Sequence, residues 1–373
     1  MSTKKRFLVI VEDDFELMGD GGGNVADLQY LPSAFLADVG EELGIKFSFM
    51  VDVAQQLTVS RYSEGNPGMR LQKELWDLCV RMLKERGFDV QLHLHPQWYA
   101  ATYEAGLLTV GDNWNIGKCP GSVQKEMIDK SVRYLADLLG DIEPGYSPVA
   151  FKAGMWGLQP SAPLLGHLAA AGIRIVAGVR HGMSIPHMGV DYRRLEEPFQ
   201  PYHPRMDDVT KLAETRNQLI VVPLQAYNES VAGFLRMAWD NIGWRRESKR
   251  RVGGLSGPLS SMCARPRSPS RGLGQGKIAW PYVSHLRMGF QSFHYLKSAF
   301  DMVIGRLRRL DVPRIPVLIE SHTKHYHGRY GDIRKFLRYV VSAYRDEVEF
   351  GTMAGLAAEI AEEPSLVRSG GSR

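Results

Sequence analysis

Two histidines separated by a single residue carry the clearest chemical signal in this sequence. His93 and His95 end the apolar stretch 90–94, and Pro96 follows them. Because residues i and i+2 of a strand project from the same face, both imidazoles can bind one ion. A carboxylate from a neighbouring strand would complete a site that suits Zn²⁺ in hydrolysis or Fe²⁺ in oxygen chemistry. The alternative is a pair of polar residues that hydrogen-bond at the end of a strand.

Acidic residues that could complete such a site follow the first apolar stretch, residues 7–11. These are Glu12, Asp13 and Asp14. If the strand geometry persists, Asp13 and Asp14 point to different sides. One of them could then bind a metal ion while the other acts as a base in metal-assisted hydrolysis. A solvated acidic turn is the alternative.

Two further strand ends carry reactive side chains. Lys152 and Trp156 follow the apolar stretch 149–151, and Glu320, His322 and Lys324 follow the stretch 317–319. In a parallel α/β barrel the functional groups collect at the carboxyl ends of the strands. We therefore expect the four clusters to meet at one end of such a barrel.

Apolar strands and amphipathic helices alternate along most of the chain. We expect strands at 7–11, 47–51, 90–94, 149–151, 173–177, 219–224, 317–319 and 348–350, and helices at 31–43, 67–86, 123–139, 162–171 and 292–310, with a last helix pair around 348–350. Repeated βα units indicate a parallel sheet with helices outside it. Seven or eight such units favour an α/β fold of the distorted (β/α) barrel type over an open doubly wound sheet.

The domain organisation follows from where this alternation stops. We expect one domain over residues 1–362, with a basic, flexible insertion at 245–277 and a disordered tail at 363–373. The formal net charge is only +5, with 44% hydrophobic residues and no apolar run long enough to span a membrane. Three cysteines cannot form a disulfide framework. These features predict a soluble, cytoplasmic protein, and they leave its oligomeric state open.

The order of these motifs resembles that of the NodB-like polysaccharide deacetylase superfamily, the relatives of carbohydrate esterase family 4. The matching segments are Asp13-Asp14, residues 41–49, residues 88–93 with His95-Pro96, residues 151–154, residues 189–193 with Pro201-Tyr202, and residues 319–322. The resemblance covers roughly residues 6–350. It implies a NodB-like barrel and a divalent metal ion, most plausibly Zn²⁺, with Co²⁺, Ni²⁺ or Fe²⁺ as other options.

The resemblance also implies roles for individual residues. Asp14, His93 and His95 would hold the metal, Asp13 would be the base and His322 the acid, and Lys152 would orient Asp13. The chain departs from the family in three places. Gln97 stands where the second metal histidine usually lies, Lys152 replaces an Arg, and Glu12 adds a third acid that could shift the roles of the acidic pair by one residue.

The implied activity is hydrolysis of an N-acetyl or O-acetyl group on a saccharide. A nucleotide-linked or lipid-linked sugar of cell-surface polysaccharide biosynthesis is the expected substrate. The expected substrate-binding residues are Trp98, Trp156, Tyr192, Arg193, Tyr202 and Lys324. Alternatives are a catalytically silent carbohydrate-binding barrel and a non-haem iron enzyme with the same triad. A protein that binds nucleic acid or a membrane surface through its basic residues remains a third alternative, although no nucleic-acid motif accompanies them.

Overall fold

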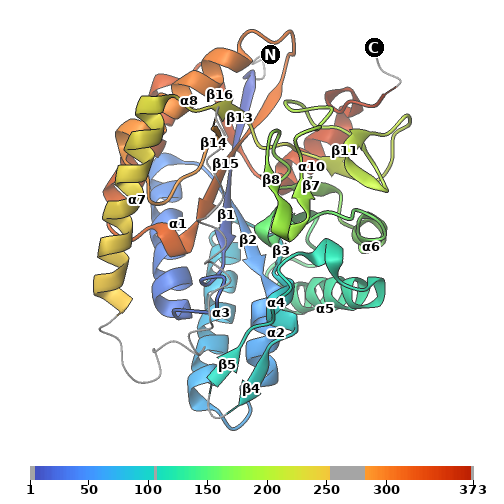
Figure 1. Ribbon diagram of the computed structural model, residues 1–373, viewed down its shortest axis with the longest axis vertical. Coiled ribbons are helices and arrows are strands. Elements are labelled where there is room, and N and C mark those ends of the chain that lie inside the picture. Colours follow the sequence, from blue (N-terminus) through green and yellow to red (C-terminus); the bar gives the residue numbers. More distant parts are fainter. Residues whose placement is uncertain (1–4, 105–106, 253–281, 371–373) are drawn as a thin grey trace.

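The computed structural model describes residues 5–104, 107–252 and 282–370. Its centre is a sheet of eight strands with helices around it (Figure 1). The strands of this sheet are β1 (Phe7–Phe15), β2 (Ser48–Asp52), β3 (Asp89–Leu94), β6 (Ala150–Ala153), β7 (Ile175–Ala177), β12 (Ile220–Val221), β15 (Ile315–His322) and β16 (Val348–Gly351). The longer helices are α1 (Leu31–Leu43), α2 (Val53–Arg61), α3 (Pro67–Glu85), α5 (Gly121–Leu139), α6 (Leu164–Ala170), α7 (Val231–Val252), α8 (Phe293–Leu307), α9 (Tyr330–Ala343) and α10 (Met353–Glu362).

All pairs in this sheet are parallel, and seven strands follow one another in the order β12-β7-β6-β3-β2-β1-β15. The eighth strand, β16, pairs with the first half of β1, and β2 pairs with its second half. Among the described residues no pairing joins β12 to β15. The expected distorted (β/α) barrel of seven or eight strands is therefore confirmed, in a form that stays open at one seam.

The strand register brings the predicted clusters side by side. Asp14 on β1 is level with His322 on β15, and His93 on β3 is level with Lys152 on β6. Asp52, the last residue of β2, is level with His93 from the other side. Because the strands are parallel, these residues all lie at the carboxyl end of the sheet.

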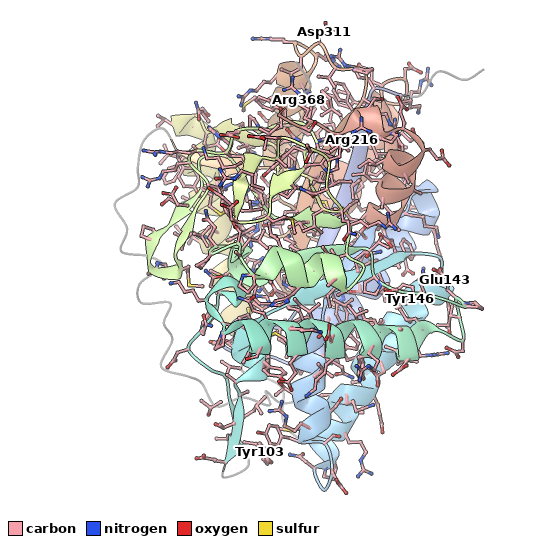
Figure 2. All side chains as sticks on the ribbon, turned by 90° about the vertical axis from the view of Figure 1, so that its right-hand side faces the viewer. Tyr103, Glu143, Tyr146, Arg216, Asp311 and Arg368 are labelled. Carbon is pink, nitrogen blue, oxygen red and sulfur yellow. The ribbon has the colours of Figure 1, made fainter. Side chains whose placement is uncertain are left out.

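The opposite end of the barrel is filled by apolar side chains and closed by α10. Leu8 and Ile10 of β1 point into this interior, where they pack with side chains from β7, β15 and α10. The backbone N–H of Met353 at the start of α10 donates to Ser48 Oγ (2.8 Å) at the start of β2. In Figure 2, Asp311 in the loop before β15 and Tyr103 in the β4–β5 hairpin (Thr102–Glu104, Leu107–Thr109) mark opposite ends of the molecule.

Local sequence signals explain why several helices begin and end where they were expected. Helix α1 spans the predicted residues 31–43 and stops at Gly44, whose φ of 65° lies in the left-handed region that favours glycine. Helix α3 starts with Pro67 in its first turn, after Asn66, whose side chain accepts a hydrogen bond from the N–H of Met69 (3.1 Å).

Two segments expected to be irregular have regular structure or buried contacts where the structure describes them. Residues 245–252, predicted as the start of a flexible insertion, continue the helix α7; residues 253–277 of that prediction lie outside the described residues. Residues 363–370, predicted as disordered tail, are held in place because Val367 is buried against the barrel interior and Arg368 pairs with Tyr202. None of the described helices combines the length and apolar character needed to cross a bilayer.

Candidate metal centre

Alternation along β1 decides which acidic side chains face the inside of the barrel. Leu8 and Ile10 point into the interior, so the period of two carries Glu12, Asp14 and Glu16 to that same side. All three carboxylates are buried at the carboxyl end of the sheet. Glu16, the residue directly after β1, thereby joins His93 of β3 and His95, which directly follows β3.

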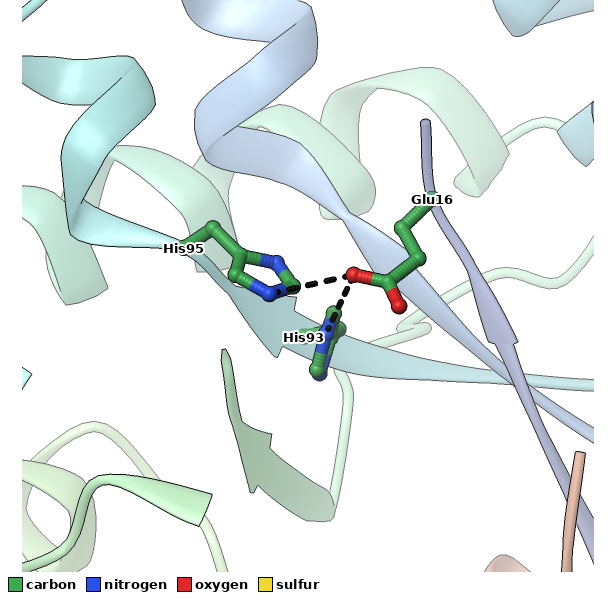
Figure 3. A group of neighbouring side chains, drawn as sticks. All are labelled: Glu16, His93 and His95. Carbon is green, nitrogen blue, oxygen red and sulfur yellow. Dashed lines mark ion pairs between the residues drawn. The ribbon is translucent and has the colours of Figure 1, made fainter. Parts of the chain in front are cut away.

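Glu16, His93 and His95 converge on one point (Figure 3). The Glu16 Oε2 atom lies 3.0 Å from His95 Nε2 and 3.6 Å from His93 Nε2. One ligand atom from each residue falls within 4.8 Å of the others. This is the donor set of two imidazoles and one carboxylate that binds divalent ions such as Zn²⁺ or Fe²⁺.

The Nδ1 atoms of both histidines lie within hydrogen-bond distance of acceptor groups. His93 Nδ1 lies 2.9 Å from the backbone carbonyl of Lys152, and His95 Nδ1 lies 3.1 Å from Asp52 Oδ2. The carbonyl and an ionised carboxylate accept hydrogen bonds, so each Nδ1 is placed to donate, and Nε2 is the ring atom that faces Glu16. His93 Nε2 is buried without a hydrogen-bond partner. The residues present therefore fit a divalent ion.

The backbone at Gly154 leaves room for the imidazole of His95. A Cβ atom at Gly154 would lie 2.3 Å from Cδ2 of His95, so only glycine allows the imidazole to approach this closely. The next two residues, Met155 and Trp156, have φ values of 50° and 56°. Such left-handed conformations are costly for residues with side chains and tend to cluster at functional sites.

Asp14 lies beside this donor set, between a lysine and a third histidine. Its carboxylate is 2.9 Å from Lys152 Nζ and 3.3 Å from His322 Nε2, and His322 Nε2 is 3.5 Å from Glu16. Burial raises the pKa of Asp14, and Glu16 adds to this effect, although Lys152 opposes it. Burial and the neighbouring Arg287 hold the pKa of His322 well below its usual range, so its ring is neutral.

Lys152 links three carboxylates. Its ammonium lies 2.9 Å from Asp14 and 3.2 Å from both Glu12 and Glu320. Burial alone would lower the pKa of Lys152, but these carboxylates outweigh it and hold the pKa well above its usual range. Burial raises the pKa of Glu12 to about 7 even though Lys152 opposes the shift.

Glu320 is the most heavily contacted of the three carboxylates. Trp156 Nε1 donates to its Oε2 (2.9 Å), and His285 Nε2 and Arg287 Nε lie 3.1 and 3.5 Å from its Oε1. Burial opposes ionisation, but Lys152 and His285 hold the pKa of Glu320 well below its usual range. Of the predicted substrate-binding residues, Trp156 therefore lies in the cluster.

Lys324 is the other predicted substrate-binding residue in the cluster, at 2.6 Å from Glu16 Oε1. Burial opposes ionisation of Glu16, but Lys324 together with His95 holds its pKa well below the usual range. Arg193 lies elsewhere: it is exposed and pairs with Asp191.

The structure places Asp13, the expected base, away from the candidate metal centre. Asp13 lies on the opposite face of β1, where Tyr326 donates to its Oδ1 (2.9 Å). Burial raises its pKa to about 8 against the opposing hydrogen bonds from Ser321 and Tyr326. Lys152 contacts Asp14 instead of orienting Asp13. Strand β1 continues beyond Val11, so Asp13 and Asp14 point to different sides, as the sequence predicts for a persisting strand.

Three of the aromatic residues expected to line a sugar cleft are buried in the structure. Trp98, Tyr192 and Tyr202 are at most 1% exposed. The hydroxyl of Tyr192 contacts the carbonyl of Trp156, and that of Tyr202 donates to the carbonyl of Val209 (2.6 Å). The hydroxyls of both tyrosines are satisfied inside the protein, and all three rings are buried in the core, so they present no face to a saccharide.

Sequence reasoning missed Glu16, Asp52, Glu320 in its ionic role, and His285. The alternation Glu12, Asp14, Glu16 was available as a signal, because period-two spacing of acids after a buried strand places them on one face. Asp52 directly follows the predicted second strand and could have been found in the same way. His285 carried no local signal, since it lies in the short strand β14 (Val283–His285).

Comparison with known proteins bears on the fold. No protein-family model matches the chain, and no curated protein matches it. Among solved structures, a protein from Mycobacterium smegmatis described as a polysaccharide deacetylase superposes with a TM-score of 0.52 at 12% identity, over 98% of this chain and 93% of that one. One from Pseudomonas aeruginosa PAO1 with the same description superposes with a TM-score of 0.51 at 12% identity, over 96% of this chain and 92% of that one. The expected resemblance is thus confirmed at the level of architecture: this chain has the fold of the polysaccharide deacetylases.

Proposed function

We propose that this protein is a metal-dependent hydrolase that removes an N-acetyl or O-acetyl group from a saccharide. The observation that carries the proposal is the convergence of Glu16, His93 and His95 within 4.8 Å of one another. It occurs at the carboxyl end of the parallel sheet, where barrels of this type place their reacting groups. The fold shared with polysaccharide deacetylases supports the same assignment.

Glu16, His93 and His95 would hold the divalent ion, and Zn²⁺ suits these ligands best. When bound, the ion supplies a Lewis acid that polarises the acyl carbonyl and makes water more acidic. The two hydrogen bonds at Nδ1, from His93 to the Lys152 carbonyl and from His95 to Asp52, fix both rings in the orientation that ligation requires.

Asp14 is placed to act as the general base. Its carboxylate lies beside the ligand set, and its raised pKa makes it a better proton acceptor than an exposed aspartate. Lys152, 2.9 Å away, holds it in position. His322 Nε2, 3.3 Å from Asp14, can pass the proton on to the departing amine or alcohol. In this proposal Asp14 takes the role that the resemblance implies for Asp13, and Glu16 takes the metal-binding role that it implies for Asp14.

Three acid variants test this division of roles. Glu16→Gln should lose the ion, as measured by metal content after dialysis against Zn²⁺. Asp14→Asn should retain the ion but lose acetate release by roughly 10²–10⁴-fold, the usual cost of removing a general base. Asp13→Asn is the matched control, because this neighbour lies on the other face of β1 and should keep both the metal and turnover.

The assay should use N-acetylated sugar nucleotides and lipid-linked N-acetylated sugars, with acetate as the product measured. Wild-type protein that takes up Zn²⁺ but releases no acetate from either class would refute the deacetylase assignment. Acetate release that persists without oxygen distinguishes hydrolysis from the chemistry of a non-haem iron oxygenase. If Asp13→Asn abolished turnover with the metal still bound, the base would have been assigned to the wrong face of β1.

A further inference from the structure

The outward face of α7 carries a stripe of exposed apolar side chains. Val231, Leu235 and Ile242 are 61%, 62% and 48% exposed, and Trp239 is 75% exposed. With 3.6 residues per turn, these four positions lie within about 80° of one another around the helix. Helix α7 stands at the outer left edge of the molecule in Figure 1. An exposed tryptophan inside an aliphatic stripe is unusual for a surface that meets only water.

The inner face of α7 fixes the orientation of this stripe. Asp240 accepts a hydrogen bond from the N–H of Ser292 (2.8 Å) at the start of α8 and lies 3.4 Å from Arg329. One turn further on, the ring of Trp244 meets that of His325 edge to face, with centroids 5.0 Å apart. Turning the apolar stripe toward the core would break these contacts, so the stripe belongs to the surface.

Basic residues accompany the apolar stripe. Arg236 is exposed on the same helix, and the sequence of the last two turns adds Arg245, Arg246, Lys249, Arg250 and Arg251. Residues 231–252 contain six basic and two acidic residues, a formal charge of +4. The apolar positions therefore lead into a strongly basic end of the helix.

We propose that α7 docks this protein on an anionic membrane surface. An amphipathic helix with aliphatic and tryptophan residues on one face and clustered Lys and Arg binds in the plane of the interface. The basic residues add attraction to anionic headgroups, and tryptophan favours the headgroup level. An exposed aliphatic stripe has no counterpart on nucleic acid, whose backbone is recognised mainly by charge. The proposal goes beyond the hydrolase activity and does not depend on it.

The test is co-sedimentation of the full-length protein with vesicles of phosphatidylcholine containing phosphatidylglycerol, and with vesicles of phosphatidylcholine alone. We expect binding to the anionic vesicles that weakens at high salt and little binding to the neutral ones. The double variant Leu235→Gln, Trp239→Gln should bind the anionic vesicles at least tenfold more weakly. Both side chains are exposed, so the variant should fold normally, which circular dichroism can verify.

The matched control is Leu78→Gln, which removes an exposed leucine (54%) from α3. This variant should bind vesicles as the wild type does. Absence of binding to anionic vesicles, or equal binding by the wild type and the double variant, would overturn the proposal. So would a wild-type dimer that the double variant converts to a monomer in light scattering, because the stripe would then be covered by a second copy of this chain.

Discussion

Replacing Lys152 by methionine tests the ionic network that underlies the candidate site. The side chain of Lys152 is 1% exposed, and its ammonium lies within 3.2 Å of Glu12, Asp14 and Glu320. Methionine has a similar length and fills most of the same space without a charge. Lys152→Met therefore leaves three buried carboxylates without their shared cation while it opens little or no cavity.

The expected loss in the free energy of unfolding is large and depends on pH. Removing one partner of a buried ion pair usually lowers the free energy of unfolding by about 3–5 kcal/mol, because the remaining charge stays buried. Here the carboxylates can take up protons instead, since the loss of Lys152 raises their pKa values. The folded variant then binds more protons than the unfolded chain, so its stability rises as the pH falls, by up to about 1.4 kcal/mol per pH unit for each proton.

Urea unfolding followed by circular dichroism at pH 8 and pH 6 measures both effects. The difference between wild type and Lys152→Met should be largest at pH 8 and clearly smaller at pH 6. Lys84→Met is the matched control, because Lys84 pairs at 2.6 Å with Glu143, which is 55% exposed. This pair should contribute only about 0–1 kcal/mol. A loss at Lys152 no greater than at Lys84, or one equal at both pH values, would refute the reasoning.

Three further predictions concern other parts of the protein. Burial raises the pKa of Asp13 from 3.8 to about 8, so this carboxyl makes the wild-type free energy of unfolding fall as the pH rises through that window. Asp13→Asn should flatten the dependence of this free energy on pH between pH 4 and 8, measured by urea unfolding, and an unchanged dependence would contradict the shift. Asp52→Asn should weaken Zn²⁺ binding by about 10–100-fold in calorimetry, because Asp52 orients His95; equal affinity would count against the proposed ligands. Deleting residues 364–373 removes the buried Val367 and should lower the free energy of unfolding by at least about 1.5 kcal/mol; an unaltered urea midpoint would show that the tail does not stabilise the barrel.

Much of the barrel could be predicted from local patterns. Helix α1 has the expected bounds because an amphipathic period leads directly to Gly44, which can adopt a positive φ. The strands β1, β2 and β3 were found because each is a short apolar run bounded by charge or a turn, as expected where both faces are buried. Helix α2 was missed, since its nine residues carry little amphipathic pattern and Asp52 starts it directly from the end of β2.

The histidines of the candidate centre were also found from sequence alone. His93 and His95 are two residues apart in an extended segment, so their side chains project from the same face, and this depends on local geometry alone. The choice of carboxylate could not be settled in this way. The apolar run ends at Val11, but hydrogen bonding to β2 and β15 extends β1 to Phe15.

That extension is a tertiary effect, and it decides the site. By continuing the alternation of β1, it turns Glu12, Asp14 and Glu16 toward the histidines and turns Asp13 toward Tyr326. Residue types and their spacing determined that this chain forms a parallel barrel with imidazoles and carboxylates at one end. Only the pairing of neighbouring strands determined which carboxylate faces the imidazoles, because the reach of a strand depends on partners that are distant in the sequence.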